Sequence, residues 1–141
     1  MYTYPEVAMQ TSYFGNVRNL PEELEPVGIA RGTPRGFKGR SVKSLAPTWD
    51  MLKLSREEYD ERFDAILAGL DPRAVYEELG DRAVLLCWEQ PGVWCHRRRV
   101  AEWLETELGL VIPEYGYARE DTLLYRDMPA AVKKRGRAPR K

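Results

Sequence analysis

The apolar run AVLLCW, residues 83–88, constrains the fold of this chain more than any other segment. It lacks the apolar and polar alternation of a strand with one face in water, so we expect a strand buried on both faces. The turn Pro91-Gly92 follows, and then a helix from about Cys95 to Leu108 that Gly109 stops. A buried strand leading directly into a helix is typical of parallel sheets.

Strand and helix signals also alternate in the rest of the chain. Ser55 with Glu58 is a capping box that opens one helix, and Asp71 followed by Pro72 opens a second helix that ends at Gly80. Further short strands are expected at Met9–Phe14, Pro26–Arg31 and Val111–Tyr115. The sequence therefore predicts an α/β fold: a single small domain with a mainly parallel central sheet and flanking helices, in a Rossmann-like three-layer arrangement.

Length and composition bound the class of protein. The 141 residues suffice for one domain with a real core, which we expect over residues 1–120, followed by a C-terminal extension over 121–141 with a disordered basic tail (133–141). No apolar run is long enough for a membrane span, and the first ten residues lack a secretory pattern. We therefore expect a cytoplasmic protein without a membrane partner, whose two cysteines are reduced rather than bridged.

The net charge of zero hides two basic segments. The last nine residues hold six basic side chains, and residues 31–43 hold five positive charges and no negative one. Such segregation favours an anionic partner, although the tail could equally serve as a solubilising end. If the partner is nucleic acid, the candidate contacts are Lys38, Arg40, Lys43, Lys133, Lys134, Arg135 and Arg137.

The chemically distinctive residues lie together, between the buried strand and the next helix. Both cysteines, Cys87 and Cys95, the only histidine, His96, and an acid, Glu89, fall within ten residues. Ligands bind at this edge of parallel sheets. A helix start lowers the pKa of a thiol, so Cys95 is a candidate nucleophile, and Glu89 and His96 are acid/base candidates. Each of these residues could instead have a purely structural role. For Cys87, in the buried strand, the more typical role is that of an inert, small apolar side chain.

Two arginines of the helix have different expected roles. Arg97 begins the inward helix face and needs a partner, either Glu89 or a bound anion. Arg98 should lie on the outer, solvated face with Glu102 and Glu105. Two cysteines eight residues apart and one histidine make a poor structural zinc set, although Glu89 could complete it. We therefore predict no metal and no cofactor, and keep a metal-binding protein as the weaker alternative.

The stretch LLCWEQPGVWCHRRRVAEWL resembles the domain-of-unknown-function 488 family, with its Cys-aromatic-Glu, Cys-His-Arg and Val-Ala-Glu-Trp-Leu blocks. The segments TSYF, IARGTP and LAPTWDML fit too, so the resemblance covers roughly residues 9–115. It implies a small α/β domain, whereas no activity is generally established for the family. Trp88 and Gln90 replace the more usual Tyr or Ala and Lys of the first block.

The resemblance also implies that the strand ending at Arg31 lies beside the strand ending at Glu89, so that Arg31 and Arg35 reach the same pocket. Trp88 and Trp94 could stack on a base there, or pack in the core. We expect an enzyme, a transferase or hydrolase, acting on a nucleotide, nucleoside or nucleic acid. The candidate substrate-binding residues are Arg31, Arg35, Cys87, Trp88 and Arg97. The alternative is a non-catalytic nucleic-acid-binding accessory protein.

Overall fold

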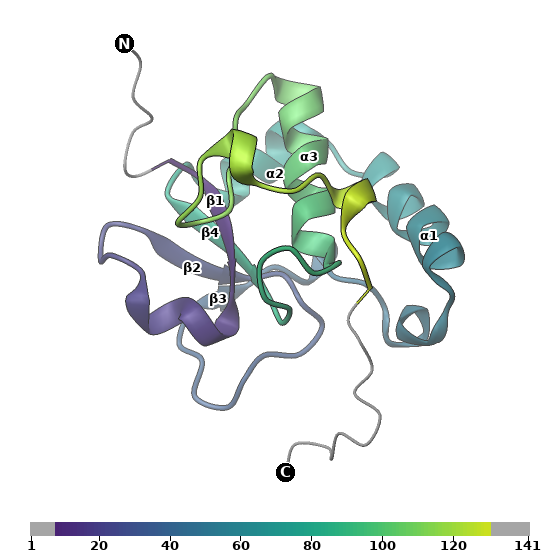
Figure 1. The fold of residues 1–141 in the computed structure, drawn as a ribbon, viewed down its shortest axis with the longest axis horizontal. Coiled ribbons are helices and arrows are strands. Elements are labelled where there is room, and N and C mark those ends of the chain that lie inside the picture. The colour runs from purple at the N-terminus through teal and green to yellow at the C-terminus, as the bar shows by residue number, and fades with distance from the viewer. Residues whose placement is uncertain (1–7, 131–141) are drawn as a thin grey trace.

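The computed structural model describes residues 8–130 of the chain (Figure 1). Its centre is a four-stranded sheet in which all neighbouring strands are parallel, in the order β1-β4-β2-β3. The strands are β1 (Gln10–Tyr13), β2 (Glu25–Gly28), β3 (Arg40–Ser41) and β4 (Ala83–Cys87). This is the small α/β fold that the sequence predicts.

Within residues 8–130 the chain also forms three α-helices and five short 3-10 helices. The α-helices are α1 (Arg56–Ala68), α2 (Pro72–Leu79) and α3 (His96–Leu108). The 3-10 helices are η1 (Phe14–Asn19), η2 (Lys43–Leu45), η3 (Trp49–Lys53), η4 (Arg119–Asp121) and η5 (Tyr125–Asp127). The predicted caps are confirmed, since the Ser55 side chain accepts from the Glu58 amide and the Asp71 side chain accepts from the Arg73 amide.

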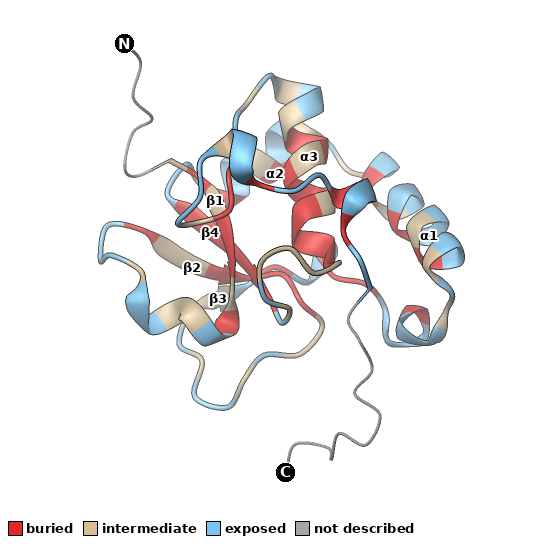
Figure 2. Ribbon diagram, in the orientation of Figure 1, coloured by how far each residue is buried: buried red, intermediate tan, exposed pale blue. Residues whose placement is uncertain are grey.

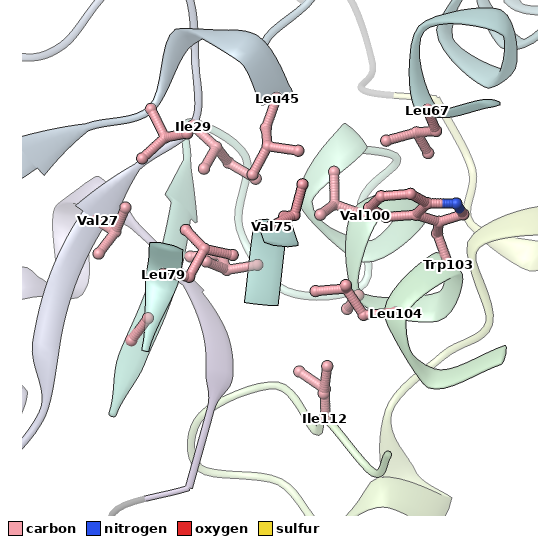
Figure 3. Packing of buried hydrophobic residues seen from close by; sticks show 14 of the residues in the cluster. Val27, Ile29, Leu45, Leu67, Val75, Leu79, Val100, Trp103, Leu104 and Ile112 are labelled. Carbon is pink, nitrogen blue, oxygen red and sulfur yellow. The ribbon is translucent and has the colours of Figure 1, made fainter. Parts of the chain in front are cut away.

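The sheet separates two apolar clusters. On one face Val27, Ile29 and Leu85 pack against side chains of the three α-helices (Figure 3). On the other face Val84 and Leu86 pack with Phe14 of η1. All five residues of β4 are therefore buried, which confirms the expectation from its unbroken apolar run (Figure 2). The arrangement is three-layered, with α-helices on one side of the sheet and η1 on the other.

The expected last strand at Val111–Tyr115 is not a strand. It forms one isolated parallel bridge, between Thr11 and Glu114. Pro113 has no amide hydrogen, so it only accepts a bond from the Thr11 amide, and the ladder does not continue along the edge strand.

The domain extends past residue 120, which corrects the expected boundary. Thr122, Tyr125 and Met128 are buried. The Tyr125 hydroxyl donates to Asp60 of α1 over 2.5 Å, and its amide donates to Glu102 of α3 over 2.7 Å. The segment after α3 thus crosses back over that helix and α1 (Figure 1).

Within residues 8–130, no helix combines the length and the apolar character needed to cross a membrane. The basic tail, with its candidate contacts Lys133, Lys134, Arg135 and Arg137, lies outside the described residues.

Candidate functional site

A pocket of about 740 Å³ opens where β2 and β4 end. This volume lies within the range of pockets that hold small organic ligands. The residues of the Cys87–His96 stretch and of the segment after β2 share it, as expected from parallel neighbouring strands. Its lining is Ala30, Arg31, Gly32, Pro47, Trp49, Leu52, Leu54, Arg56, Tyr59, Cys87, Trp88, Glu89, Trp94, Cys95, His96 and Ala130.

Two tryptophans at the pocket are unusually exposed. Trp49 is 64% exposed and Trp88 is 52% exposed. Trp88 is nonetheless held in place, because its indole nitrogen donates to the Gly32 carbonyl over 3.2 Å and its ring meets Phe14 edge to face. A Cβ added to Gly32 would lie 3.6 Å from the Trp49 ring, so Gly32 also lies near the second tryptophan. Exposed, positioned aromatic rings beside a cavity are typical of a ligand site.

A second aromatic group forms another part of the wall. Trp94 meets Tyr59 edge to face, with ring centroids 4.7 Å apart. The Arg56 guanidinium lies 5.0 Å from the Trp94 ring centroid and donates to the carbonyl oxygens of Tyr125 and Met128. Arg56 therefore joins the wall to the C-terminal segment.

The structure pairs the two cysteines as a disulfide, whereas the sequence predicts reduced thiols. Cys87 ends β4 and Cys95 is the N-cap of α3, so the bond spans the turn between strand and helix. Both are buried, although both contribute to the pocket wall. In this state Cys95 has no thiolate, so the nucleophile role predicted for it requires prior reduction.

His96 is buried at the first position of α3. Its Nε2 lies 2.6 Å from the Ile29 carbonyl oxygen, and its ring meets Phe63 edge to face. Burial lowers the pKa of His96 to about 4, since the cation would lose its hydration. The imidazole is therefore neutral near pH 7. An Nε2 that faces a carbonyl must carry the proton, which leaves Nδ1 as the acceptor.

Arg97 does not pair with the Glu89 side chain and does not line the pocket. It forms a buried ion pair with Glu114, with Nη2 2.7 Å from Oε2, and only 1% of its side chain is exposed. Nη1 of Arg97 donates to the backbone carbonyl of Glu89 over 2.7 Å. The predicted anion-binding role of Arg97 is corrected to a structural one, because these donors already bind protein groups.

Arg98 is buried, which corrects the expectation of a solvated outer face. Only 1% of it is exposed, and its Nη1 donates to the Thr11 hydroxyl over 2.9 Å. Among residues 8–130 its Nε and Nη2 have no hydrogen-bond partner. Burial lowers the pKa of Arg98 to about 10. The helix packs against β1 and against η5, so the part of its surface that carries Arg98 is not solvated.

The expected anion contacts around residues 31–43 have mixed outcomes. Arg31 lines the pocket, and its guanidinium donates to the Pro47 carbonyl over 2.8 Å and to two further carbonyls of the same loop. The Lys43 ammonium donates to the Arg31 carbonyl. Both cations therefore help to hold this loop closed. Arg35 and Lys38 are exposed and lie outside the pocket lining.

Arg40, a predicted nucleic-acid contact, makes several structural contacts within the protein. It forms an ion pair with Glu25, at 2.8 Å, and donates to the carbonyl oxygens of Glu78 and Leu79 at the end of α2. It thereby satisfies carbonyl groups that a helix end leaves without partners, and it joins β3 to β2 and α2.

Sequence reasoning missed several wall residues and the buried acid. Trp49, Tyr59 and Arg56 come from the 45–60 region, which is far in sequence from the Cys-His-Arg block. Glu114 is 3% exposed, in the apolar segment VIPEY. An acid in an apolar segment needs a buried cation, and matching it to the inward-facing Arg97 was the available signal.

Comparison with known proteins gives no relative: no family model, no curated protein and no solved structure matches this chain. The resemblance to the domain-of-unknown-function 488 family therefore remains a prediction.

Proposed function

We propose that this protein is an enzyme that binds a phosphorylated, nucleotide-like small molecule in the pocket at the ends of β2 and β4 and acts on it by group transfer or hydrolysis. The observation that carries the proposal is the pocket itself, whose wall combines exposed tryptophans with the chain's histidine and both cysteines. Such a combination of apolar walls and a few polar groups is typical of small-molecule sites.

The shape of the wall supports a planar group in the ligand. Trp49 and Trp88 present ring surface to solvent and both lie near Gly32. Stacking of a base on an aromatic ring contributes about 1–3 kcal/mol per base. A nucleobase would cover apolar surface that is otherwise exposed to water.

The charged side chains of the pocket wall support an anionic group in the ligand. Arg31 and Arg56 contribute two positive charges, Glu89 contributes one negative charge, and His96 is neutral. The hydrogen bonds of both arginines to carbonyl oxygens fix their positions but leave their charge. The resulting positive field favours a phosphate-bearing ligand.

Two groups could move a proton. His96 has a neutral ring with one acceptor nitrogen, so near pH 7 it suits a base rather than an acid. Glu89 lines the same pocket and is only half-buried. A hydrolase or transferase needs one such group near the attacking nucleophile, and the pocket offers both.

Thermal unfolding in the presence of ligands tests the proposal. The panel holds adenosine and guanosine nucleotides, a dinucleotide, ribose 5-phosphate and a short oligonucleotide. A true ligand at about 100 times its Kd adds about 2.7 kcal/mol to the free energy of unfolding. Incubation of the stabilising nucleotide with the protein, followed by phosphorus NMR, then tests turnover.

A matched pair of variants locates the binding. Trp88→Ala removes a 52% exposed ring from the pocket, and Tyr117→Ala removes a 48% exposed ring that lies outside its lining. We expect the shift to vanish in the first variant and to persist in the second. Stabilisation by the oligonucleotide alone, lost at high salt and unchanged in Trp88→Ala, would instead support the nucleic-acid-binding alternative. No shift from any ligand would refute binding in this pocket.

A further inference from the structure

Three metal-ligating side chains converge at the base of the turn between β4 and α3. The Sγ atoms of Cys87 and Cys95 and a ring nitrogen of His96 all lie within 4.8 Å of one another, and all three residues are buried. Two thiolates and an imidazole are ligands that Zn²⁺ prefers. Since no solvent-exposed acid takes part, this group differs from the surface carboxylate clusters that form by chance.

The distances suit one shared ion. With Zn–S bonds of about 2.3 Å and a tetrahedral angle, two coordinating sulfur atoms lie about 3.8 Å apart. The Cα atoms of Cys87 and Cys95 are 7.1 Å apart, a wider spacing than the usual ~4.4–6.8 Å of disulfide-bonded pairs. A backbone spacing of this width leaves room for the two sulfur atoms of the reduced side chains to separate to that distance.

Neighbouring groups stabilise each ligand in its metal-binding form. Arg97 Nη1 donates to the Cys87 Sγ atom over 3.2 Å, which favours a thiolate. Cys95 is the N-cap of α3, where the helix dipole also favours a negative sulfur. His96 Nε2 faces the Ile29 carbonyl oxygen at 2.6 Å, and a second bond of this kind fixes the ring of a metal-bound histidine.

We propose that Cys87, Cys95 and His96 of the reduced protein bind one Zn²⁺ ion, and that the Cys87–Cys95 disulfide is the metal-free oxidised form. Two thiolates balance the charge of the ion, so a neutral centre replaces the buried disulfide. All three ligands line the large pocket, so we place the fourth coordination position toward its interior. In the zinc-bound form the free nitrogen of His96 is a ligand, so Glu89 is then the group that moves a proton. Three protein ligands with an open fourth position are typical of catalytic rather than structural zinc.

The two forms interconvert by reactions in which atoms and electrons balance. A phosphine reductant and one water molecule convert the disulfide into two thiols and leave a phosphine oxide. Zn²⁺ then displaces one proton from each thiol. In the reverse direction a two-electron oxidant such as hydrogen peroxide accepts the two electrons of the thiolates. The sulfur–sulfur bond forms, the zinc ion is released, and the peroxide leaves as two water molecules after taking up two protons from solvent. The site would thus couple metal content to redox state.

The test titrates the full chain with Co²⁺ and then Zn²⁺, anaerobically, after reduction by a phosphine that is removed before titration. We expect one Co²⁺ per chain, with the visible bands of tetrahedral cobalt and a thiolate-to-cobalt charge-transfer band, and displacement of Co²⁺ by Zn²⁺. Oxidised protein should show neither band. This comparison needs no variant, so a variant that fails to fold cannot obscure the result.

Variants then assign the ligands. Cys95→Ser and His96→Ala should each weaken Zn²⁺ binding by more than about 100-fold, because changing only an outer-shell partner already costs 10–100-fold. Glu120→Gln, at an exposed position outside both the trio and the pocket lining, should keep the charge-transfer band and bind within about threefold of wild type. Folded, reduced wild-type protein without the charge-transfer band would overturn the proposal, and so would a band that survives Cys95→Ser. The zinc site and the ligand site can fail separately, because the titration uses no nucleotide.

Discussion

Arg97 of α3 and Glu114 form a two-armed ion pair in the interior, with Nε 3.1 Å from Oε1 and Nη2 2.7 Å from Oε2. The Thr11 hydroxyl of β1 donates to the same carboxylate over 2.6 Å. One acid thus ties helix α3 to the edge strand and to the segment that follows the helix. It also positions Arg97, whose remaining donors hold Cys87 and the Glu89 carbonyl at the pocket.

Breaking this ion pair should destabilise the fold. Arg97→Met leaves the Glu114 carboxylate buried without its cation, and Glu114→Gln leaves the Arg97 guanidinium without its anion. We expect each change to lower the free energy of unfolding by about 3–5 kcal/mol. Urea unfolding followed by circular dichroism measures it.

The double variant Arg97→Met with Glu114→Gln provides the control for that result. It removes both charges together. The decrease in its free energy of unfolding should therefore be clearly smaller than the sum of the decreases in the two single variants. Additive losses would show that the two side chains act independently and would contradict the paired geometry.

Arg98 should behave differently from Arg97, although it is the next residue and equally buried. Its Nε and Nη2 have no hydrogen-bond partner within the described part of the chain, so burying its charge is poorly compensated. Arg98→Met should therefore change the free energy of unfolding by less than about 1 kcal/mol, or increase it. A loss as large as that of Arg97→Met would mean that Arg98 has a strong partner in solution.

The ion pair between Glu25 and Arg40 predicts a pH dependence. The hydrogen bond from Arg40 lowers the pKa of Glu25 below its ordinary value. A carboxyl whose folded pKa is lowered stabilises the fold above its unfolded pKa of about 4.3, and this contribution is lost as the pH falls through the folded value. Both side chains are partly exposed, so the contribution at pH 7 should be below about 1 kcal/mol.

Comparing wild type with Glu25→Gln isolates this effect. The stability difference between the two proteins, from parallel urea titrations, should be present at pH 7 and shrink toward zero as the pH falls below about 4. A difference that stays constant over this range would show that Glu25 acts through something other than its charge.

The main elements could be predicted from local patterns. The unbroken apolar run 83–87 and the caps at Ser55 and Asp71 mark β4 and the starts of α1 and α2, because capping and double-sided burial are local in sequence. The convergence of Cys87, Glu89 and the start of α3 on the pocket also follows from the order strand, turn, helix.

The errors arose where burial depends on a distant segment. Helical spacing assigned Arg98 to the outer face, but β1 and η5 pack against helix α3 and leave Arg98 buried. Glu114 pairs with Arg97 across 17 residues, and no local pattern reveals such a partner. Trp49 reaches the pocket from 3-10 helix η3, where the sequence carries only a weak signal. These are tertiary contacts, and a single sequence does not encode them in its periodicity.

The central claim, that a nucleotide-like ligand binds between the tryptophans at the ends of β2 and β4, is tested most directly by NMR of the indole N–H groups. The chain has four tryptophans: Trp49, Trp88 and Trp94 line the pocket, whereas Trp103 packs in the core behind it. Titration of the nucleotide into nitrogen-15-labelled protein should shift the three pocket indole signals and leave the Trp103 signal in place. Equal shifts of all four, or a Trp103 shift alone, would contradict the account.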